Sequence, residues 1–144
     1  MTDINNLKWM LDYEISQSTR YRRFLSLVML SSDWDSEKFH RILEGMLRSS
    51  DVFFTINGSF AVLMGETDMA EALNAVERYQ RVISGAMDVQ YSVATFPDDA
   101  KSTSELIDIA YRRLKTAHEL DSGAVVTMVT KGLFLQNKTK PGIE

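Results

Sequence analysis

The sequence predicts an α+β domain in which a mainly antiparallel sheet is covered by helices. Three observations support this fold class. Apolar residues recur at helical spacing in some segments and as strand-like runs in others, an Asn-Gly turn joins two of these runs, and the inner elements follow the order β-α-β-β-α-β. That order is typical of ferredoxin-like sheets. With 144 residues, 44% of them apolar, the chain is expected to form one domain over residues 1–144.

Composition excludes several classes of partner and location. The net charge is -4 and the pI is about 5.2, so no basic field exists to attract nucleic acid or an anionic membrane. There is no cysteine, which excludes disulfides and thiolate metal sites. The N-terminus lacks the features of a signal peptide, and the longest apolar run, 27–30, is too short to cross a bilayer. The expected location is cytoplasmic.

The N-terminal third is expected to form helix, strand and helix. Leu7, Leu11 and Ile15 recur every four residues and predict a helix over about 6–22, within an N-terminal helical segment 1–22. FLSLVML (24–30) is typical of a strand buried on both faces. The polar run SSDWDS (31–36) supplies N-caps rather than metal ligands. The next helix is expected to place five apolar side chains on one stripe: Phe39, Ile42, Leu43, Met46 and Leu47.

The strongest local signal is a hairpin over FFTINGSFAVLM (53–64). A two-residue type I′ loop needs positive φ at both positions, and Asn57-Gly58 tolerates this best. The loop fixes the register of the two strands. The expected pairs are Ile56 with Ser59, Thr55 with Phe60, and Phe54 with Ala61.

The remaining elements follow from capping and turn signals. Asp68 with Glu71, and Ser102 with Glu105, predict capping boxes that open two helices, which run to about Ser84 and Leu120. Leu106, Ala110, Leu114 and Ala117 line the inner face of the second helix. The expected strands are 88–96, 124–130 and a short segment within 132–137, and the tail 137–144 is expected to be flexible.

Three stretches carry a resemblance to a known family: SLVMLSSDWD (26–35), RSSDVFFTINGSFAVLM (48–64) and YSVATFPDDAKSTSELIDIAYRRLKTA (91–117). Together they resemble the GGDEF domain of bacterial diguanylate cyclases, which condense two GTP into cyclic di-GMP. The resemblance implies a nucleotidyl cyclase-like fold and a role in bacterial cyclic di-GMP signalling.

The residues that carry the family's chemistry are replaced. The first metal-binding carboxylate corresponds to Ser31, and the GGDEF turn has become Ile56-Asn57-Gly58-Ser59-Phe60, one residue shorter. A phosphate-contacting lysine corresponds to His118, and the guanine-recognising stretch is absent. The resemblance therefore implies a degenerate domain that is no enzyme and holds neither a metal nor a cofactor.

One family feature is retained. Arg48 and Asp51 form the only RxxD, at the place where the family's inhibitory site holds cyclic di-GMP. Arginine suits phosphate and guanine edges, and aspartate accepts from a guanine N–H pair. The alternative explanation is structural, because Asp51 also suits the start of a strand and Arg48 the end of a helix.

The expected function is regulatory, by binding another signalling protein whose identity the sequence does not give. The alternative is a cyclic di-GMP receptor acting through Arg48 and Asp51, and a homodimer also stays open. Trp9 is expected at the core edge and His40 on a helix surface. The candidate partner surface comprises two basic groups and one aromatic residue: Arg20, Arg22 and Arg23; Arg112 and Arg113; and Trp34.

Overall fold

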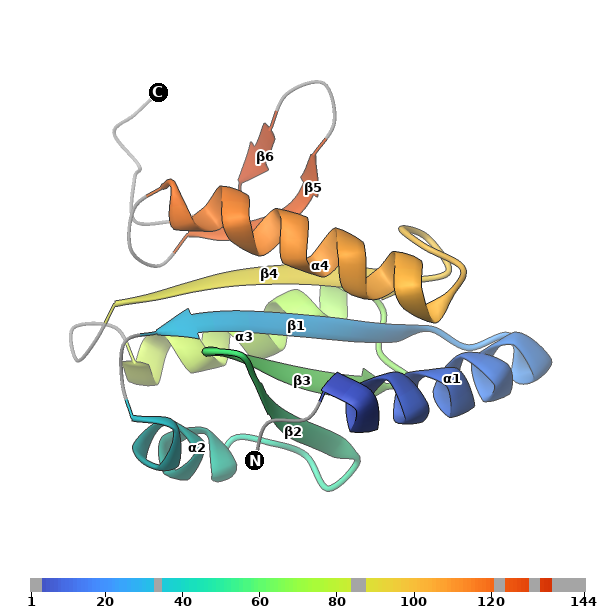
Figure 1. Ribbon diagram of the computed structural model, residues 1–144, viewed down its shortest axis with the longest axis horizontal. Helices are drawn as coiled ribbons and strands as arrows, with labels where there is room; N and C mark the ends of the chain where they lie inside the picture. The colour runs from blue at the N-terminus through green and yellow to red at the C-terminus, as the bar shows by residue number, and fades with distance from the viewer. Residues whose placement is uncertain (1–3, 33–34, 84–87, 121–123, 130–132, 136–144) are drawn as a thin grey trace.

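The computed structural model describes residues 4–32, 35–83, 88–120, 124–129 and 133–135. Four helices and six strands follow the predicted order in this part of the chain (Figure 1). In chain order they are α1 Ile4–Tyr21, β1 Leu25–Ser32, α2 Ser36–Glu44, β2 Asp51–Ile56, β3 Ser59–Gly65, α3 Met69–Ile83, β4 Val89–Phe96, α4 Thr103–His118, β5 Val125–Val129 and β6 Leu133–Leu135. The tail 137–144 lies outside the described residues. None of the described helices is long and apolar enough to cross a membrane.

The strands form one sheet in the order β2-β3-β1-β4-β5-β6. All neighbouring pairs are antiparallel except β4 and β5, which are parallel and are joined through α4. The mainly antiparallel α+β class is therefore confirmed. β1 lies in the centre, between β3 and β4, which explains why its apolar run has no polar alternation.

Helices cover both faces of the sheet and create two hydrophobic cores (Figure 1). α1 and α4 pack on the face that receives Leu25, Leu27 and Met29 of β1. α2 and α3 pack on the opposite face, which receives Val28 and Leu30. The alternation of β1 side chains thus divides the molecule into two buried layers. The four residues expected on the inner face of α4 are all buried.

Three helix starts carry the expected caps, with one difference. The Asp35 carboxylate accepts from the Lys38 N–H, and Asp68 and Glu71 exchange side chain–backbone hydrogen bonds of 2.8 and 2.9 Å, a complete capping box. At α4 the Ser102 hydroxyl accepts from the Glu105 N–H. The Glu105 carboxylate, however, accepts from the Lys101 N–H, so the prediction of a reciprocal box at Ser102 is wrong.

Two helix boundaries differ from the prediction. α1 ends at Tyr21, because Arg22 has a positive φ of 56° and leaves the helix. α2 ends at Glu44 with Gly45 as its C-cap, so Met46 and Leu47 follow the helix instead of extending its stripe. Both still pack against the α2–α3 core. The helical spacing of apolar residues continues through Leu47, although the helix itself ends at Glu44, so the spacing predicted too long a helix.

The expectation of an exposed Arg113 is wrong. Its side chain is 9% exposed and ion-paired with Asp99 at 3.0 Å, and Nη1 also donates to the Val93 carbonyl at 2.8 Å. Burial of a charged group is tolerated when an opposite charge and hydrogen bonds satisfy it. Arg113 therefore stabilises the fold and offers no surface to a partner.

Candidate functional site

The end of β1 corresponds to the metal-binding end of the family resemblance. Ser31 is buried and pairs across the sheet with Ser59 on one side and Gln90 on the other. Its hydroxyl lies 2.9 Å from Nε2 of His118, the last residue of α4. Two serines, an amide and an imidazole thus meet where the resemblance places carboxylates and a lysine. Among these four side chains, Ser31 and His118 are hydrogen-bonded to each other, and none is a carboxylate of the kind that holds divalent cations.

The hairpin turn has the predicted geometry. Asn57 and Gly58 have φ of 43° and 83°, as a type I′ loop requires, and both are exposed. Ile56 pairs with Ser59, and the register further along matches the prediction at Thr55 with Phe60 and Phe54 with Ala61. The loop closes the strands with two residues, and no acidic side chain lies in it.

Aromatic rings fill the space between the hairpin and α2. Phe60 is the last residue of the altered motif, and its ring stacks on that of Phe39. The Phe60 ring centroid lies 4.5 Å from the centroid of Phe39 and 5.7 Å from that of Phe53. His40 stacks on Phe53 at 4.4 Å with nearly parallel planes, while its residue remains exposed, as expected. Such ring pairs stabilise the fold by more than the burial of their apolar surface alone. The sequence showed these aromatics only as separate apolar positions.

The described residues contain no group of three or more His, Asp or Glu side chains that could hold a metal ion. Asp33 and Trp34 lie outside the part of the chain that the structure describes, so the expectation of a partner-binding Trp34 stays a prediction.

The RxxD residues are brought together in a tight turn before β2. Asp51 accepts a 2.8 Å hydrogen bond from the Arg48 backbone N–H and a longer 3.4 Å contact from Nη2 of the same residue. Nη2 also donates to the Thr67 hydroxyl at 2.6 Å. The Asp51 side chain is only 2% exposed, whereas that of Arg48 is 50% exposed. The carboxylate is thus engaged inside the motif, and the guanidinium faces outward.

A pocket of about 210 Å³ adjoins this turn. Sequence reasoning missed that α3 contributes a second arginine, Arg78, together with Glu71 and Asn74. The signal was available, since Asn74 and Arg78 are four residues apart on one helix face. The volume is below the range of about 300–1,000 Å³ that is typical of small-molecule sites.

Tyr79 lies behind this pocket on the buried face of α3. Burial raises the pKa of Tyr79 to about 12, and the negative charge of Asp51 adds to the effect. Its hydroxyl is buried and has no hydrogen-bond partner among the described residues. Burial also raises the pKa of Tyr91, on the same face of the sheet.

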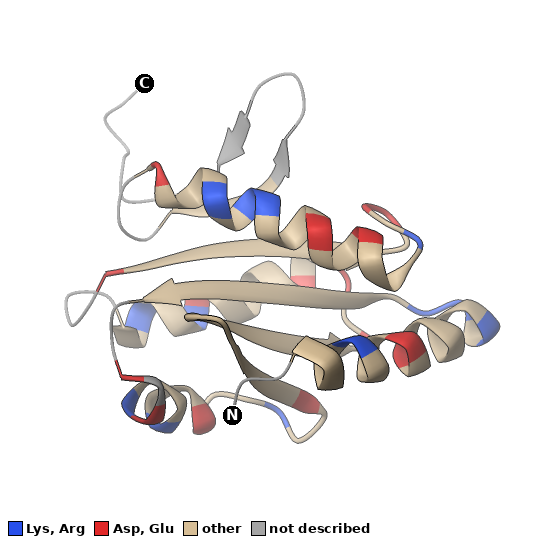
Figure 2. Ribbon diagram, viewed as in Figure 1, with Lys and Arg blue, Asp and Glu red and all other residues tan. Residues whose placement is uncertain are grey.

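The candidate partner surface is divided by the fold. Arg20, Arg22 and Arg23 gather at the end of α1, where Arg23 pairs with Glu66 at 2.8 Å and lies over the Tyr21 ring. Arg112 is exposed on α4 and pairs with Asp108 at 3.2 Å. Figure 2 shows the basic residues of the later part of α4 well apart from those at the end of α1. The structure therefore does not join the two basic groups into one surface.

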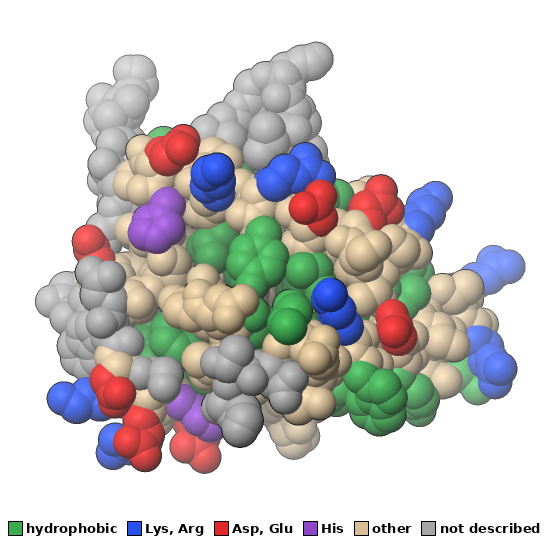
Figure 3. All heavy atoms as spheres, viewed as in Figure 1, with side chains coloured by type: hydrophobic (Ala, Val, Ile, Leu, Met, Phe, Trp, Pro, Cys, Tyr) green, Lys and Arg blue, Asp and Glu red, His purple; other side chains and the backbone are tan. Residues whose placement is uncertain are grey.

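Exposed aromatic side chains on α1 add a feature that the sequence did not reveal. Trp9 and Tyr13, one helical turn apart, are 70% and 57% exposed. The expectation that Trp9 lies at the core edge is wrong, because Leu7 and Leu11 occupy the buried side of the helix. Figure 3 shows exposed hydrophobic surface over α1 and between α1 and α4.

Comparisons with known proteins identify the fold. No family model and no curated protein matches the sequence. The GGDEF domain of YfiN (TpbB) from Pseudomonas aeruginosa is similar over 86% of this chain and 94% of its own, with 17% identity and a TM-score of 0.76. The diguanylate cyclase SiaD from the same species, in complex with its activator SiaC, is similar over 85% of this chain and 56% of its own (17% identity, TM-score 0.70).

A microbial GGDEF domain studied for its interaction with cyclic di-GMP is similar over 83% of this chain and 86% of its own, with 14% identity and a TM-score of 0.67. Identities this low establish the architecture alone. The chain has the fold of a GGDEF domain.

Proposed function

We propose that the protein is a non-catalytic regulatory module of cyclic di-GMP signalling that acts by binding another protein. The observation that carries the proposal is the serine at the position where the resemblance expects the first metal-binding carboxylate. Ser31 pairs with Ser59 and contacts His118 at 2.9 Å, at the positions where the resemblance expects carboxylates and a lysine.

The chemistry of cyclase activity requires charge at this place. Two divalent cations hold the triphosphate and neutralise the charge that develops on transfer, and carboxylates are their ordinary protein ligands. Serine hydroxyls are poor substitutes for anionic ligands of Mg²⁺. The aromatic stack of Phe39, Phe60 and Phe53 further indicates that the hairpin is used for packing.

Binding of a protein is supported by the surface and by one structural neighbour. Trp9, Tyr13 and Tyr21 are each more than half exposed, and aromatic side chains are enriched at protein interfaces. The neighbour SiaD is observed in complex with its activator SiaC. This chain matches 56% of SiaD, so the complex supports partner binding by a protein that contains this fold, and we assign that role to this chain.

The absence of catalysis is tested by incubation with GTP and either Mg²⁺ or Mn²⁺, followed by chromatography for cyclic di-GMP. We expect no product from the wild type, with an active diguanylate cyclase as the positive control. A Ser31→Asp variant tests whether one restored carboxylate suffices, and it too is expected to be inactive because the hairpin contributes none. Formation of cyclic di-GMP by the wild type would overturn the proposal.

Partner binding is tested by affinity capture from the native host. We expect a specific protein to be retained, and retention to fall when Trp9 and Tyr13 or the basic residues at the end of α1 are replaced. An Arg81→Ala variant is a matched control, since Arg81 is exposed on α3, on the other face of the sheet. Failure to retain any specific protein would contradict the proposed role.

A second candidate function is cyclic di-GMP binding at the RxxD turn. Arg48 is half exposed, and Arg78 brings a second cation to the same pocket. One structural neighbour is a GGDEF domain studied with cyclic di-GMP. Against this role, Asp51 is almost completely buried and already bonded to Arg48.

Calorimetry separates the two functions. Titration of cyclic di-GMP into the wild type, Arg48→Ala and Arg81→Ala supports a receptor only if heat is lost with Arg48→Ala and kept with Arg81→Ala. Absence of heat with the wild type at high micromolar ligand would remove the receptor and leave partner binding as the function.

A further inference from the structure

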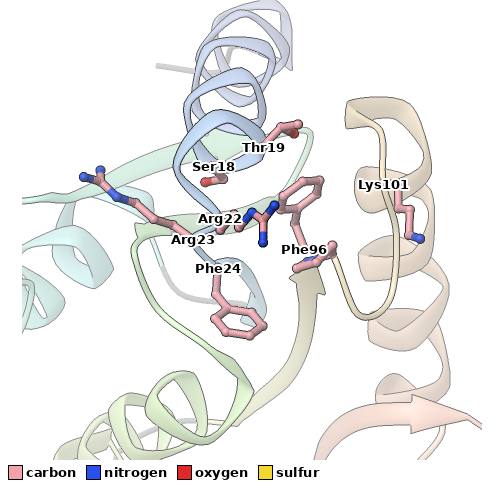
Figure 4. Close-up of a pocket in the computed structure, with 8 residues that line it drawn as sticks. Ser18, Thr19, Arg22, Arg23, Phe24, Phe96 and Lys101 are labelled. Carbon is pink, nitrogen blue, oxygen red and sulfur yellow. The ribbon is translucent and has the colours of Figure 1, made fainter.

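We infer that the pocket at the end of α1 binds an acidic segment of a protein partner, with one apolar side chain of that segment inserted among aromatic residues. The inference rests on the proposed function and names the partner's chemistry. It is carried by the arrangement of the side chains drawn in Figure 4.

The pocket joins three distant parts of the chain. The end of α1, the start of β1 and the turn from β4 to α4 enclose about 490 Å³, within the usual size of a binding site. The lining residues are Ser18, Thr19, Arg22, Arg23, Phe24, Phe96, Pro97 and Lys101. Sequence analysis singled out the arginines but could not place Phe96 and Lys101 opposite them, because β1 and β4 are far apart in sequence and paired at Leu25 and Phe96.

Arg22 occupies a backbone position that normally favours glycine. Its φ is 56°, and the Arg23 N–H donates to the Ser18 carbonyl at 2.9 Å, the bonding pattern of a Schellman motif. Glycine adopts this conformation without the steric cost that a side chain adds. The backbone therefore gives no reason for an arginine at this position. We infer that the reason lies in its side chain, which lines the pocket.

The cations around the pocket are spread apart. In Figure 4 Arg23 extends to one side, Lys101 lies on the other, and Arg22 lies between them beside Phe96. A compact phosphate group is bound best by cations that converge on it. Cations spaced along a rim match a chain that carries several separate carboxylates.

The charges around the pocket favour a partner segment that carries several carboxylates. Arg22 and Lys101 form no ion pair with the residues that the structure describes, whereas Arg23 is paired with Glu66. Of the carboxylates in the neighbouring turn, Asp99 is committed to Arg113, and Asp98 is exposed.

The apolar part of the pocket supplies an anchor point. Phe24 is 39% exposed, and Phe96 and Pro97 form the adjoining wall. Tyr21 is more than half exposed and is held beside Arg20 and Arg23, whose guanidinium carbons lie 6.0 and 5.0 Å from its ring centroid. Arginine and aromatic residues around a concave centre are typical of interface hot spots.

The test uses the full chain and a short fluorescein-labelled peptide in which glutamates surround one leucine. Fluorescence anisotropy is recorded for the wild type, Arg22→Gly, Lys101→Gln and the Arg81→Ala control. We expect Arg22→Gly to weaken binding about tenfold, because it removes a charge-assisted contact. The same variant should unfold at an equal or higher urea concentration, since glycine suits the backbone at this position.

Two further peptides give the inference its specificity. Replacing the glutamates by glutamine, or the leucine by serine, should each weaken binding, and added salt should weaken binding of the acidic peptide most.

Absence of binding by the wild type, equal binding by Arg22→Gly, or an equal loss with Arg81→Ala would overturn the inference. Displacement of the peptide by GTP or cyclic di-GMP in an Arg22-dependent manner would also overturn it and assign the pocket to nucleotides. A partner captured equally by the wild type and Arg22→Gly would overturn this inference while leaving the proposed function intact.

Discussion

Arg113 and Asp99 are joined by two parallel hydrogen bonds of 3.0 and 3.1 Å, and both side chains are less than a tenth exposed. The same Asp99 carboxylate accepts from the Thr95 N–H at 2.8 Å, and Arg113 also donates to the Val93 carbonyl. The pair therefore ties the turn after β4 to the middle of α4. This turn also forms one wall of the pocket at the end of α1.

Arg113→Ala is expected to destabilise the protein by about 3 kcal/mol, because it leaves the Asp99 carboxylate buried without its counter-ion. Urea denaturation measures the loss. The matched control is Arg112→Ala, whose exposed pair with Asp108 should contribute less than about 1 kcal/mol. Equal losses for the two variants would contradict the structural role assigned to Arg113.

Gly58→Ala is expected to cost about 1 kcal/mol, because φ of 83° is unfavourable for a residue with a Cβ. No atom lies within 4 Å of the added Cβ, so the cost comes from the backbone alone. Gly45→Ala is the control: it has the same free space but a φ of -72°, so it should be neutral or slightly stabilising. If both variants were neutral in urea denaturation, the type I′ turn would be wrong.

Local signals predicted the elements because the short-range rules and the fold agree. The Asn57-Gly58 turn fixed the hairpin register, and the Asp68–Glu71 box fixed the start of α3. Predictions went wrong where long-range contacts decide. Helical spacing assigned Arg113 to a surface, but the turn at Asp99, fourteen residues earlier, supplies its partner and draws it inside.

The candidate sites show the same limit. Single positions such as Ser31 and Arg48 could be compared with the family pattern. The contact of Ser31 with His118 spans 87 residues, and the pocket near Arg48 is formed by residues of α3 together with Asp51 and Met64. Neither follows from sequence spacing, because each depends on how a helix is placed over the sheet by the whole fold.

Tyr79→Phe is expected to make the protein more resistant to alkaline unfolding. The pKa of Tyr79 is raised from 10.0 to about 12, so the unfolded state releases this proton first. The free energy of unfolding of the wild type therefore does not depend on Tyr79 ionisation below pH 10, and it falls as the pH rises from 10 toward 12.

The variant should match or slightly exceed the wild type in urea denaturation at pH 8, since the lost hydroxyl has no described partner. At pH 11 its advantage should grow by on the order of 1 kcal/mol. Tyr91, whose pKa is also raised, keeps a residual pH dependence in both proteins. An advantage that does not change with pH would contradict the buried, neutral state of Tyr79.

Asp51→Ala is expected to lower stability by about 1–2 kcal/mol, and Arg48→Ala by less than about 1 kcal/mol. The reason is the asymmetry of the pair. The Asp51 carboxylate is 2% exposed and holds the turn through the Arg48 N–H, whereas the Arg48 side chain is half in solvent. Urea denaturation of the two variants gives the order. The opposite order would mean that the Arg48 guanidinium holds the turn through its 2.6 Å hydrogen bond to the Thr67 hydroxyl. The guanidinium would then be less available to bind a ligand.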